Sequence, residues 1–459
     1  MNGSTRPNGA APDGARTDST PALVIVPSLP TRFQAEGEGA IRRTDDARLT
    51  EAIGLARAID LDVRHASIAP TPQPRPGTLL GPGKVAEIAD AVQSHEAELV
   101  VVDHMLNPVQ QRNLEREWNA KVLDRTGLIL EIFGRRAATK EGTLQVELAH
   151  LDYQRGRLVR SWTHLERQRG GAGFLGGPGE TQIEADRRIL REKIVRLERQ
   201  LETVRRTRQL QRAKRQKVPH PIVALVGYTN AGKSTLFNRL TGADVLAENM
   251  LFATLDPTLR RLTLPHGETV ILSDTVGFIS NLPTQLIAAF RATLEEVREA
   301  DLILHVRDLS DPDHAAQADD VAAVLDSLGI SGEWRDRTIE VWNKVDALDD
   351  ETRAHSTTLA ERSALEEHRV SALTGEGVPE LLDAIEARIG GELRRIEVHI
   401  GPEQGDRLDW FYSHGRVLNR DDREDGSVDL LVELTSSAAA KLGPVSTAAS
   451  ASEAYDPLA

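Results

Sequence analysis

The segment IVALVGYTNAGKSTLFNRL, residues 222–240, constrains the fold of this chain more than any other. An apolar run is followed by a Gly-x-x-x-x-Gly-Lys-Ser pattern at 227–234 and then by apolar residues at helical spacing. Glycines at these positions let successive backbone amides converge on a phosphate, helped by the dipole of the following helix. The segment therefore predicts an α/β domain with a mostly parallel sheet and a nucleotide phosphate site beyond its first strand.

Two later motifs follow apolar runs in the order expected of a GTP-binding domain. DTVG at 274–277 comes after TVILS, where a carboxylate can reach Mg²⁺ through water and a glycine amide can contact the γ-phosphate. NKVD at 343–346 comes after TIEVW, and the Asp346 carboxylate can accept two hydrogen bonds from guanine that adenine cannot offer. Each motif alone is weak, because DTVG recurs by chance and NKVD resembles a polar turn. Together and in this order they select GTP.

A switch segment is expected between the first two motifs, in LFATLDPTLRR at 251–261. A threonine there should complete the Mg²⁺ shell and contact the γ-phosphate, and both Thr254 and Thr258 qualify. We favour Thr254, which has an Asp-Pro turn behind it; a plain loop threonine is the alternative interpretation. The predicted metal ligands are then Ser234 and Thr254, with Asp274 reaching Mg²⁺ through water.

The predicted nucleotide contacts combine these motifs with SAL at 371–373, whose backbone amides can face guanine O6. Lys233 should bridge β- and γ-phosphate oxygens. The predicted nucleotide-binding residues are Gly227, Tyr228, Thr229, Asn230, Ala231, Gly232, Lys233, Ser234, Thr235, Phe252, Ala253, Thr254, Leu255, Asp256, Asp274, Thr275, Val276, Gly277, Asn343, Lys344, Val345, Asp346, Ser371, Ala372 and Leu373.

The residue after the DTVG glycine raises a mechanistic question. Many GTP hydrolases place a glutamine there to orient the attacking water. This chain has Phe278, whose side chain neither donates nor accepts a hydrogen bond. The Phe278 side chain therefore leaves open what positions the water, and it is compatible with a role in covering this segment against the core.

The N-terminal part of the chain indicates a second α/β domain, over residues 22–140. ALVIV at 22–26 and ELVVVD at 98–103 are continuous apolar runs, which are typical of strands buried in a parallel sheet. An amphipathic segment at 85–95 lies between them. LGPGK at 80–84 lacks the full spacing of a phosphate-binding loop, so we interpret it as a turn into that helix.

A long helical hairpin is expected at 141–218. Six glycines between positions 170 and 179 cannot hold regular structure alone, and TQIE at 181–184 fits a capping box, so a helix should begin near Thr181. A dimer and an intramolecular hairpin satisfy its short seam equally well, and we expect a monomer. The seam has the spacing of about two coiled-coil heptads and consists of Leu190, Ile194, Leu197, Leu201 and Val204.

The same helix is strongly basic. Residues 187–217 contain thirteen Lys/Arg and three Glu, a local charge of +10 in a chain whose net charge is −14. A solvated helix face is the ordinary interpretation, but this excess favours binding to RNA phosphates. The glycine-rich loop is either a flexible connector or an RNA probe. The predicted RNA contacts are Arg205, Arg206, Arg208 and Arg212.

Composition excludes several other classes of protein. The chain has no cysteine, so disulfide frameworks and thiolate metal sites are ruled out. It has no apolar run of about 18 residues, so we expect no membrane span, and its polar N-terminus is not a signal peptide. We expect a soluble, cytoplasmic protein of several domains.

The C-terminal region completes the predicted domain order. IEVHI and SVDLLVEL flank a short helical stretch in which Trp410 and Phe411 should pack the core of a small α+β domain. The predicted order is a disordered tail at 1–21, the N-terminal α/β domain at 22–140, the helical hairpin at 141–218, the G domain at 219–392, the α+β domain at 393–441 and a frayed tail at 442–459.

Three groups of segments resemble the HflX family of ribosome-associated GTPases: FATLDPT beside SDTVGFI, GGPGETQIEADRR, and LNPVQQRNLE. The likeness covers roughly residues 22–435. It implies a GTPase that binds the large ribosomal subunit and its rRNA and can separate stalled ribosomes into subunits, often under stress. It also implies an N-terminal domain, a helical linker, a G domain and a small C-terminal domain, in that order.

The resemblance also bears on Phe278. Similar GTPases carry a hydrophobic residue at that position, and some use K⁺ held partly by a P-loop asparagine, a position that Asn230 occupies here. Slow hydrolysis stimulated by the ribosome follows as a hypothesis, although Asn230 could simply cap its loop. The implied ligands are GTP or GDP with Mg²⁺ and K⁺, and the predicted catalytic residues are Lys233, Thr254, Gly277 and Asn230.

Two other functions are compatible with the sequence. One is a GTPase of ribosome assembly, and the other is an RNA-binding scaffold whose G domain is catalytically idle. The scaffold is disfavoured because every phosphate-contact motif is retained.

Overall fold

The computed structural model describes residues 19–30, 43–168, 178–215, 220–243, 252, 258–280, 296–327, 334–353, 366–391, 393–404, 406–441 and 447–448. The chain divides into two compact units. One comprises Met1–Gln34 with Asp45–Ile129, and the other comprises Ala35–Thr44 with Leu130–Ala459. Across the described ranges, no helix combines the length and the apolar character needed to span a bilayer.

The first unit is built on a four-stranded parallel sheet in the order β2-β1-β3-β4. The two predicted apolar runs form its central strands, whose side chains are buried on both faces, as a sheet covered by helices requires. Gly81 caps the helix predicted after LGPGK. The elements are β1 (Pro21–Ser28), α1 (Asp45–Arg57), β2 (Asp62–Pro70), α2 (Pro82–Ser94), β3 (Leu99–Val102), α3 (Pro108–Trp118) and β4 (Lys121–Asp124), followed by α4 (Arg125–Arg136).

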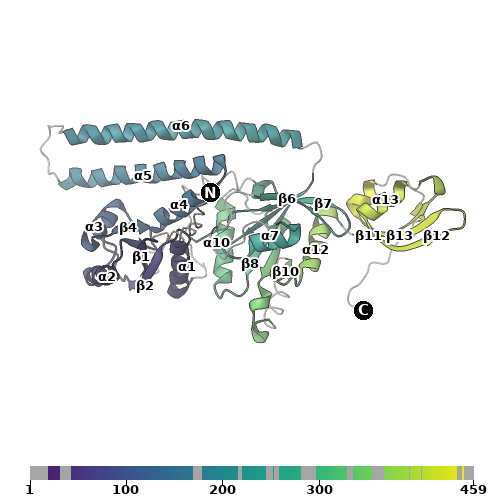
Figure 1. The fold of residues 1–459 in the computed structure, drawn as a ribbon, viewed down its shortest axis with the longest axis horizontal. Coiled ribbons are helices and arrows are strands. Elements are labelled where there is room, and N and C mark those ends of the chain that lie inside the picture. The colour runs from purple at the N-terminus through teal and green to yellow at the C-terminus, as the bar shows by residue number, and fades with distance from the viewer. Residues whose placement is uncertain are drawn as a thin grey trace, which may run out of the picture. The chain divides into compact units, whose positions relative to one another are not determined.

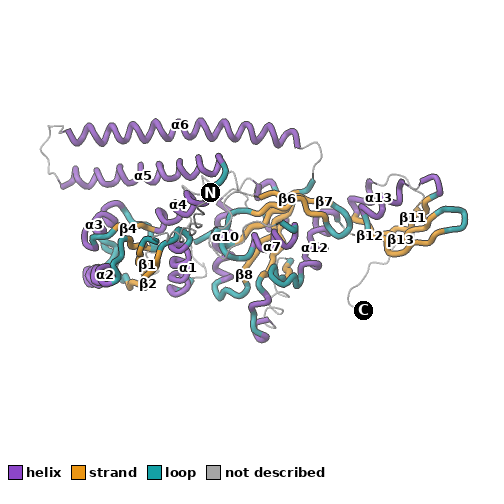
Figure 2. The backbone as a smooth tube through the Cα atoms, in the orientation of Figure 1, coloured by secondary structure: helices purple, strands orange, loops and turns teal. Residues whose placement is uncertain are grey.

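Two long helices form a hairpin, α5 (Lys140–Gln168) and α6 (Pro178–Arg215), which lie side by side in Figures 1 and 2. Ile194, Leu197 and Leu201 of α6 pack with Leu144 and Leu151 of α5. The predicted seam is therefore satisfied within one chain.

The start of α6 differs from the prediction. The helix begins at Pro178 rather than near Thr181, which places the TQIE segment inside it. Proline is tolerated in a first helical turn, because its missing N–H would have no partner there. The glycine-rich loop up to residue 177 lies outside the described residues.

A six-stranded sheet in the order β10-β9-β8-β5-β7-β6 forms the G domain. All neighbours pair in parallel except β6 and β7, which form an antiparallel edge. The mostly parallel α/β fold predicted from the sequence is thus confirmed. Its elements are β5 (Ile222–Gly227), α7 (Lys233–Thr241), β6 (Thr258–Thr263), β7 (Thr269–Asp274), β8 (Leu302–Asp308), α10 (His314–Ser327), β9 (Thr338–Asn343), η3 (Val345–Ala347), β10 (Glu367–Arg369) and α12 (Val378–Gly390).

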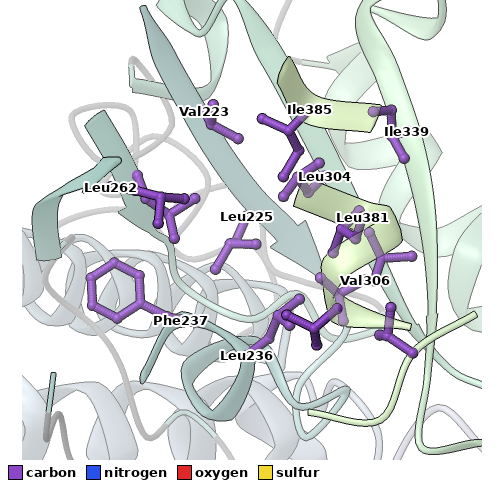
Figure 3. Close-up of a cluster of buried hydrophobic side chains, with 14 of the residues drawn as sticks. Val223, Leu225, Leu236, Phe237, Leu262, Leu304, Val306, Ile339, Leu381 and Ile385 are labelled. Atoms are coloured by element: carbon purple, nitrogen blue, oxygen red, sulfur yellow. The ribbon is translucent and has the colours of Figure 1, made fainter. Parts of the chain in front are cut away.

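The core of the G domain lies between this sheet and its helices (Figure 3). Leu225 of β5 and Leu304 of β8 are fully buried, as are Leu236 of α7 and Leu381 of α12. Burying an aliphatic side chain of this kind contributes about 2 kcal/mol. This packing fixes the carboxyl ends of the parallel strands, where ligands bind in open α/β sheets.

The C-terminal segment forms a four-stranded antiparallel sheet in the order β12-β13-β11-β14. Phe411 is fully buried in its core and Trp410 packs against that core, as predicted. The small α+β domain is confirmed. Its elements are β11 (Leu393–Ile400), α13 (Asp406–His414), β12 (Arg416–Asp422), β13 (Val428–Thr435), α14 (Ser436–Lys441) and β14 (Thr447–Ala448).

The turn between β6 and β7 packs against α12 and the C-terminal sheet. The backbone N–H of His266 donates to the Glu386 carboxylate at 2.9 Å, and its ring Nδ1 lies 2.6 Å from the same group. Its Nε2 lies 3.6 Å from Glu433 Oε2. Burial raises the pKa of Glu386, and the hydrogen bonds from His266 oppose that rise. The His266 ring thus links the turn to α12 through Nδ1 and to β13 through Nε2.

Candidate functional site

The predicted phosphate-binding loop joins β5 to α7 at the carboxyl edge of the sheet. Gly227 has a φ of +152°, and a Cβ there would overlap Val306 O of β8. Gly232 has a φ of +92°, and a Cβ there would overlap the side-chain nitrogen of Asn343. Only glycine fits both positions. The loop therefore lies directly against β8 and the NKVD motif.

Two predicted residues at the tip of this loop differ in exposure. Asn230 is exposed and has a φ of +63°, a conformation that asparagine tolerates better than most residues. Thr229 is 6% exposed, and among the described residues its hydroxyl oxygen has no hydrogen-bond partner. Ala231 is buried, and Thr235 is half-buried in the first turn of α7.

Lys233 is buried at the start of α7. Its ammonium group donates to Tyr228 O at 2.7 Å, and a Cβ built on Gly277 would lie 3.0 Å from its Nζ. Burial lowers the pKa of Lys233 to about 8, while the nearby Asp274 carboxylate opposes that shift. A polyanion at this loop would stabilise the charged ammonium.

Ser234 and Asp274 place oxygen atoms that could coordinate a metal ion next to that lysine. The Ser234 hydroxyl donates to Asp274 Oδ2 at 2.8 Å, so β7 brings its last residue to the start of α7. A hydroxyl beside a carboxylate is the hard oxygen donor set that Mg²⁺ prefers. The residues present therefore fit a magnesium ion.

The rest of the DTVG motif is buried against the loop. The Thr275 hydroxyl donates to Leu225 O at 2.5 Å, and Val276 is 6% exposed. A Cβ at Gly277 would lie 2.9 Å from the Thr229 methyl group. A side chain at 277 would crowd the loop, so glycine allows the backbone to approach it.

Phe278 is fastened to the same loop by its backbone. Its N–H donates to Gly227 O at 3.1 Å, and its carbonyl accepts from Thr229 N at 2.7 Å. The side chain is 3% exposed. Phe278 thus covers the segment against the core, as the sequence suggested, and presents no polar group to a nucleotide.

Asn343 joins three motifs through one side chain. Its amide nitrogen donates to Ala231 O at 2.8 Å, and its amide oxygen accepts from Ala372 N at 2.9 Å. The side chain is buried. The NKVD motif, the SAL triplet and the phosphate-binding loop therefore meet at one point of the sheet edge.

Asp346, the residue predicted to select guanine, is held by the SAL triplet. The Ser371 hydroxyl donates to Asp346 Oδ1 at 2.5 Å and accepts from Thr374 N at 3.0 Å. Asp346 itself is exposed and lies in η3 just after the buried Val345. The Ser371 hydroxyl therefore orients the Asp346 carboxylate, which remains accessible to solvent.

Two residues with no place in the predicted motifs contact the NKVD and SAL segments. Asp308, at the end of β8, accepts from the Lys344 ammonium at 2.6 Å. Arg239 of α7 donates to Ala372 O at 3.1 Å and also to Leu373 O. The only sequence signal for Asp308 was a carboxylate after an apolar run, and Arg239 carried none.

The predicted switch segment falls largely beyond what the structure describes. Ala253, Thr254, Leu255 and Asp256 lie outside the described residues. Phe252 is described; its side chain is 2% exposed and packs edge-on against Phe133, with ring centroids 4.7 Å apart. It can therefore contact a nucleotide only through its backbone.

The predicted RNA-binding residues lie on α6. Arg206 is exposed and lies 3.3 Å from Glu202, one turn earlier. The side chains of Arg205, Arg208 and Arg212 are outside the described part of the molecule.

Four family models match this chain in succession. They are GTP-binding GTPase N-terminal at residues 46–134, GTP-binding GTPase Middle Region at 136–215, 50S ribosome-binding GTPase at 222–344 and HflX C-terminal domain at 358–449. Together they cover the N-terminal unit from α1 onward but not β1, and then the hairpin, most of the G domain and the C-terminal sheet.

Curated relatives match over most of their length. A GTPase HflX from Magnetococcus marinus is 51% identical over 388 residues, which is 84% of this chain and 88% of the relative. A GTPase HflX from Escherichia coli is 48% identical over 362 residues, 79% of this chain and 83% of the relative. One from Lacrimispora saccharolytica is 41% identical over 403 residues, 88% of this chain and 91% of the relative.

A solved structure is similar at a lower level. The crystal structure of a GTP-binding protein from Sulfolobus solfataricus in complex with GDP covers 80% of this chain and 98% of its own, with 23% identity and a TM-score of 0.41. A TM-score this low supports no conclusion about the present chain.

Proposed function

Because this chain belongs to the HflX family of GTPases, we propose that it hydrolyses GTP and couples GTP binding and hydrolysis to binding the large ribosomal subunit and splitting ribosomes under stress. One observation carries the proposal. The phosphate-binding loop, the DTVG segment and both proposed base-recognition motifs lie at one edge of one sheet. Asn343 links the loop to the SAL triplet, and Asp274 of DTVG accepts from Ser234 at the end of the loop.

The phosphates would bind over the loop from 227 to 234. Backbone amides before α7 and the positive end of that helix favour anions. The buried Lys233 ammonium supplies a charge that a γ-phosphate neutralises, and the Thr229 hydroxyl is a further polar group at the loop. We assign Gly277 to sense the γ-phosphate through its amide, since its lack of a side chain permits the close approach to Thr229.

Magnesium would be held by the Ser234 hydroxyl, with Asp274 acting through water and Thr254 from the switch segment. When bound there, Mg²⁺ would neutralise negative charge on the phosphates. Asp274 also accepts from Ser234, which orients the hydroxyl before any metal binds.

Hydrolysis needs a substitute for the missing glutamine. The buried ring of Phe278 cannot orient water, so we propose that turnover is slow until the ribosome closes the switch segments. Asn230, exposed at the loop, is the proposed K⁺ ligand. Hydrolysis should then be faster in potassium than in sodium buffer, and Asn230→Ala should abolish that difference. Equal rates in both buffers would remove K⁺ from the proposal.

Turnover measurements test the enzymatic part. The purified chain should hydrolyse GTP slowly and ATP not at all, and ribosomes should accelerate GTP hydrolysis. A G domain that binds GTP but is not accelerated would favour the scaffold alternative. Preference for ATP would overturn the assignment of Asp346.

Sucrose-gradient sedimentation tests the ribosomal part. With a non-hydrolysable GTP analogue the protein should travel with the large subunit, and intact ribosomes should separate into subunits. Binding to large subunits without separation of intact ribosomes would favour the assembly alternative. No binding in either nucleotide state would contradict the proposed ribosomal role.

A further inference from the structure

Tyr228, the second residue of the phosphate-binding loop, has a hydroxyl that accepts two hydrogen bonds from distant parts of the chain. The Arg43 guanidinium donates from Nη1 at 2.8 Å, and the Ser280 backbone N–H donates at 2.8 Å. Tyr228 is 4% exposed, so both bonds are shielded from water. Hydrogen bonds from a cation in such surroundings are stronger than those between neutral groups.

Arg43 is itself held from two sides. Its guanidinium carbon lies 5.4 Å from the centre of the Tyr228 ring, a cation–π distance. Its Nε lies 3.5 Å from Asp313 Oδ2, and the two side chains are only 11% and 10% exposed. Arg43 precedes Tyr228 by 185 residues, yet its segment belongs to the same compact unit as the G domain. Charge and ring contacts thus fix its orientation.

Ser280, which bonds the Tyr228 hydroxyl, belongs to the segment that follows DTVG. Two backbone hydrogen bonds already join Phe278 to Gly227 and Thr229. The bond from Ser280 to the Tyr228 hydroxyl is a third attachment, and it depends on a side chain. The position of 278–280 therefore depends on where the phenol is held.

We propose that Arg43 is a positioning residue for GTP hydrolysis. It holds the Tyr228 hydroxyl where it anchors Ser280, and so keeps Gly277 and Phe278 in register with the phosphate-binding loop. Arg43 acts through Tyr228 and not on the nucleotide, and it lies outside the segment that carries the GTP-binding motifs. The inference rests on the proposed GTPase function and adds a residue from the N-terminal segment to its site.

Single-turnover kinetics on the full chain test this inference. Arg43→Gln and Tyr228→Phe should each slow GTP hydrolysis about tenfold, the effect of one charge-assisted hydrogen bond. GDP affinity should stay within about twofold, because Tyr228 is expected to contact the nucleotide through its backbone, while its hydroxyl is bonded to Arg43 and Ser280. The double variant should be no slower than the slower single variant, since both remove one shared contact. Arg43→Lys, which keeps the charge beside Asp313, should recover most of the rate.

A matched control and the opposing results complete the experiment. Arg335 also lies over an aromatic ring, 5.2 Å from the centre of Trp334, and Arg335→Gln should leave the rate unchanged. Unchanged hydrolysis in Arg43→Gln, or a parallel loss of GDP affinity and thermal stability, would overturn the positioning role. An unaltered chain that binds GDP but never hydrolyses GTP would instead overturn the proposed function.

Discussion

At the scale of single residues, Lys233 should make nucleotide binding depend on pH. Burial lowers its pKa to about 8, and bound phosphates would raise it again by favouring the charged ammonium. Above about pH 8 the free protein must therefore take up a proton to bind. GDP affinity should fall with rising pH, by up to about tenfold per unit, until the pKa of the complex is reached.

Calorimetry in two buffers of different ionisation enthalpy measures this proton directly. At pH 9 close to one proton should be taken up per GDP bound, because nucleotide phosphates, with a second pKa of about 6, are already fully ionised. Lys233→Arg should remove the effect, since arginine stays charged throughout. Binding at pH 9 without proton uptake would contradict the role of Lys233.

Asp346 should set the choice of base. Asp346→Asn replaces an acceptor of two hydrogen bonds by a group that presents an N–H to guanine donors, so GTP affinity should fall by at least about a hundredfold. Affinity for xanthosine triphosphate, which has an oxygen where guanine has its amine, should rise. Asp350→Asn, an exposed acid nearby, should change neither affinity. Fluorescent-nucleotide competition measures all three, and an unchanged preference for GTP would contradict the assignment.

What could be predicted at this scale depended on local sequence. Gly232, Ser234 and Asp274 stood out because each lies at the end of a strand or the start of a helix within a short pattern. Asp308 and Arg43 did not, because they act on partners 36 and 185 residues away. No spacing rule connects such pairs, and only the folded sheet brings them together.

At the scale of elements, the turn between β6 and β7 should not tolerate a side chain. Gly267 has a φ of +88°, and a Cβ there would overlap Ser413 O of α13. Gly267→Ala should lower thermal stability by the equivalent of at least about 1–2 kcal/mol, the cost of the left-handed conformation alone. Gly156→Ala in α5, where a Cβ would meet nothing, should be neutral or stabilising. Calorimetric scans distinguish the two, and equal transition temperatures would contradict the packing of this turn.

The neighbouring strands β8 and β9 should be sensitive to acid. Burial alone would raise the pKa of Glu340, but the imidazole of His305 and the Arg307 guanidinium, 2.6 Å away, lower it to about 2. A carboxylate with a lowered pKa stabilises the fold above its unfolded pKa of about 4.5, and this contribution is lost as pH falls towards 2. The full contribution of ionised Glu340 to the free energy of unfolding is about 3 kcal/mol.

Glu340→Gln should therefore lower the transition temperature at neutral pH, and the gap from the unaltered chain should narrow as pH falls from 5 to 3. Glu424→Gln, an exposed acid, serves as control and should leave the transition temperature nearly unchanged. A gap that stays constant with pH would show that Glu340 stabilises through packing and not through its charge.

Continuous apolar runs predicted β1, β3, β5, β7 and β9, because a strand buried on both faces has a strong sequence signal. Exposed strands had a weaker sequence signal. The side chains of β12, for example, are mostly exposed, and its sequence has no apolar run. The start of α6 was misplaced because a capping-box pattern is only four residues long, while Pro178, three residues before it, is tolerated in the first helical turn.

At the scale of the whole molecule, charge is separated along the chain. The net charge of −14 opposes general affinity for RNA, while residues 187–217 carry +10. If the chain binds a ribosome as proposed, we expect the contact at the basic helix. It should weaken steeply with salt, because each neutralised phosphate releases a condensed cation.

Reversing four charges on α6 tests whether the helix itself makes this contact. Changing Arg205, Arg206, Arg208 and Arg212 to Glu should abolish co-sedimentation with ribosomes at moderate salt. Any binding at lower salt should depend less steeply on salt concentration. GTP affinity should stay unchanged. A control with the same change in net charge replaces four exposed arginines elsewhere by Glu: Arg335, Arg394, Arg407 and Arg416. If α6 is the contact, the control still binds. Equal loss in both variants would mean that only net charge matters, and retention by the α6 variant would place the RNA contact on another part of the molecule.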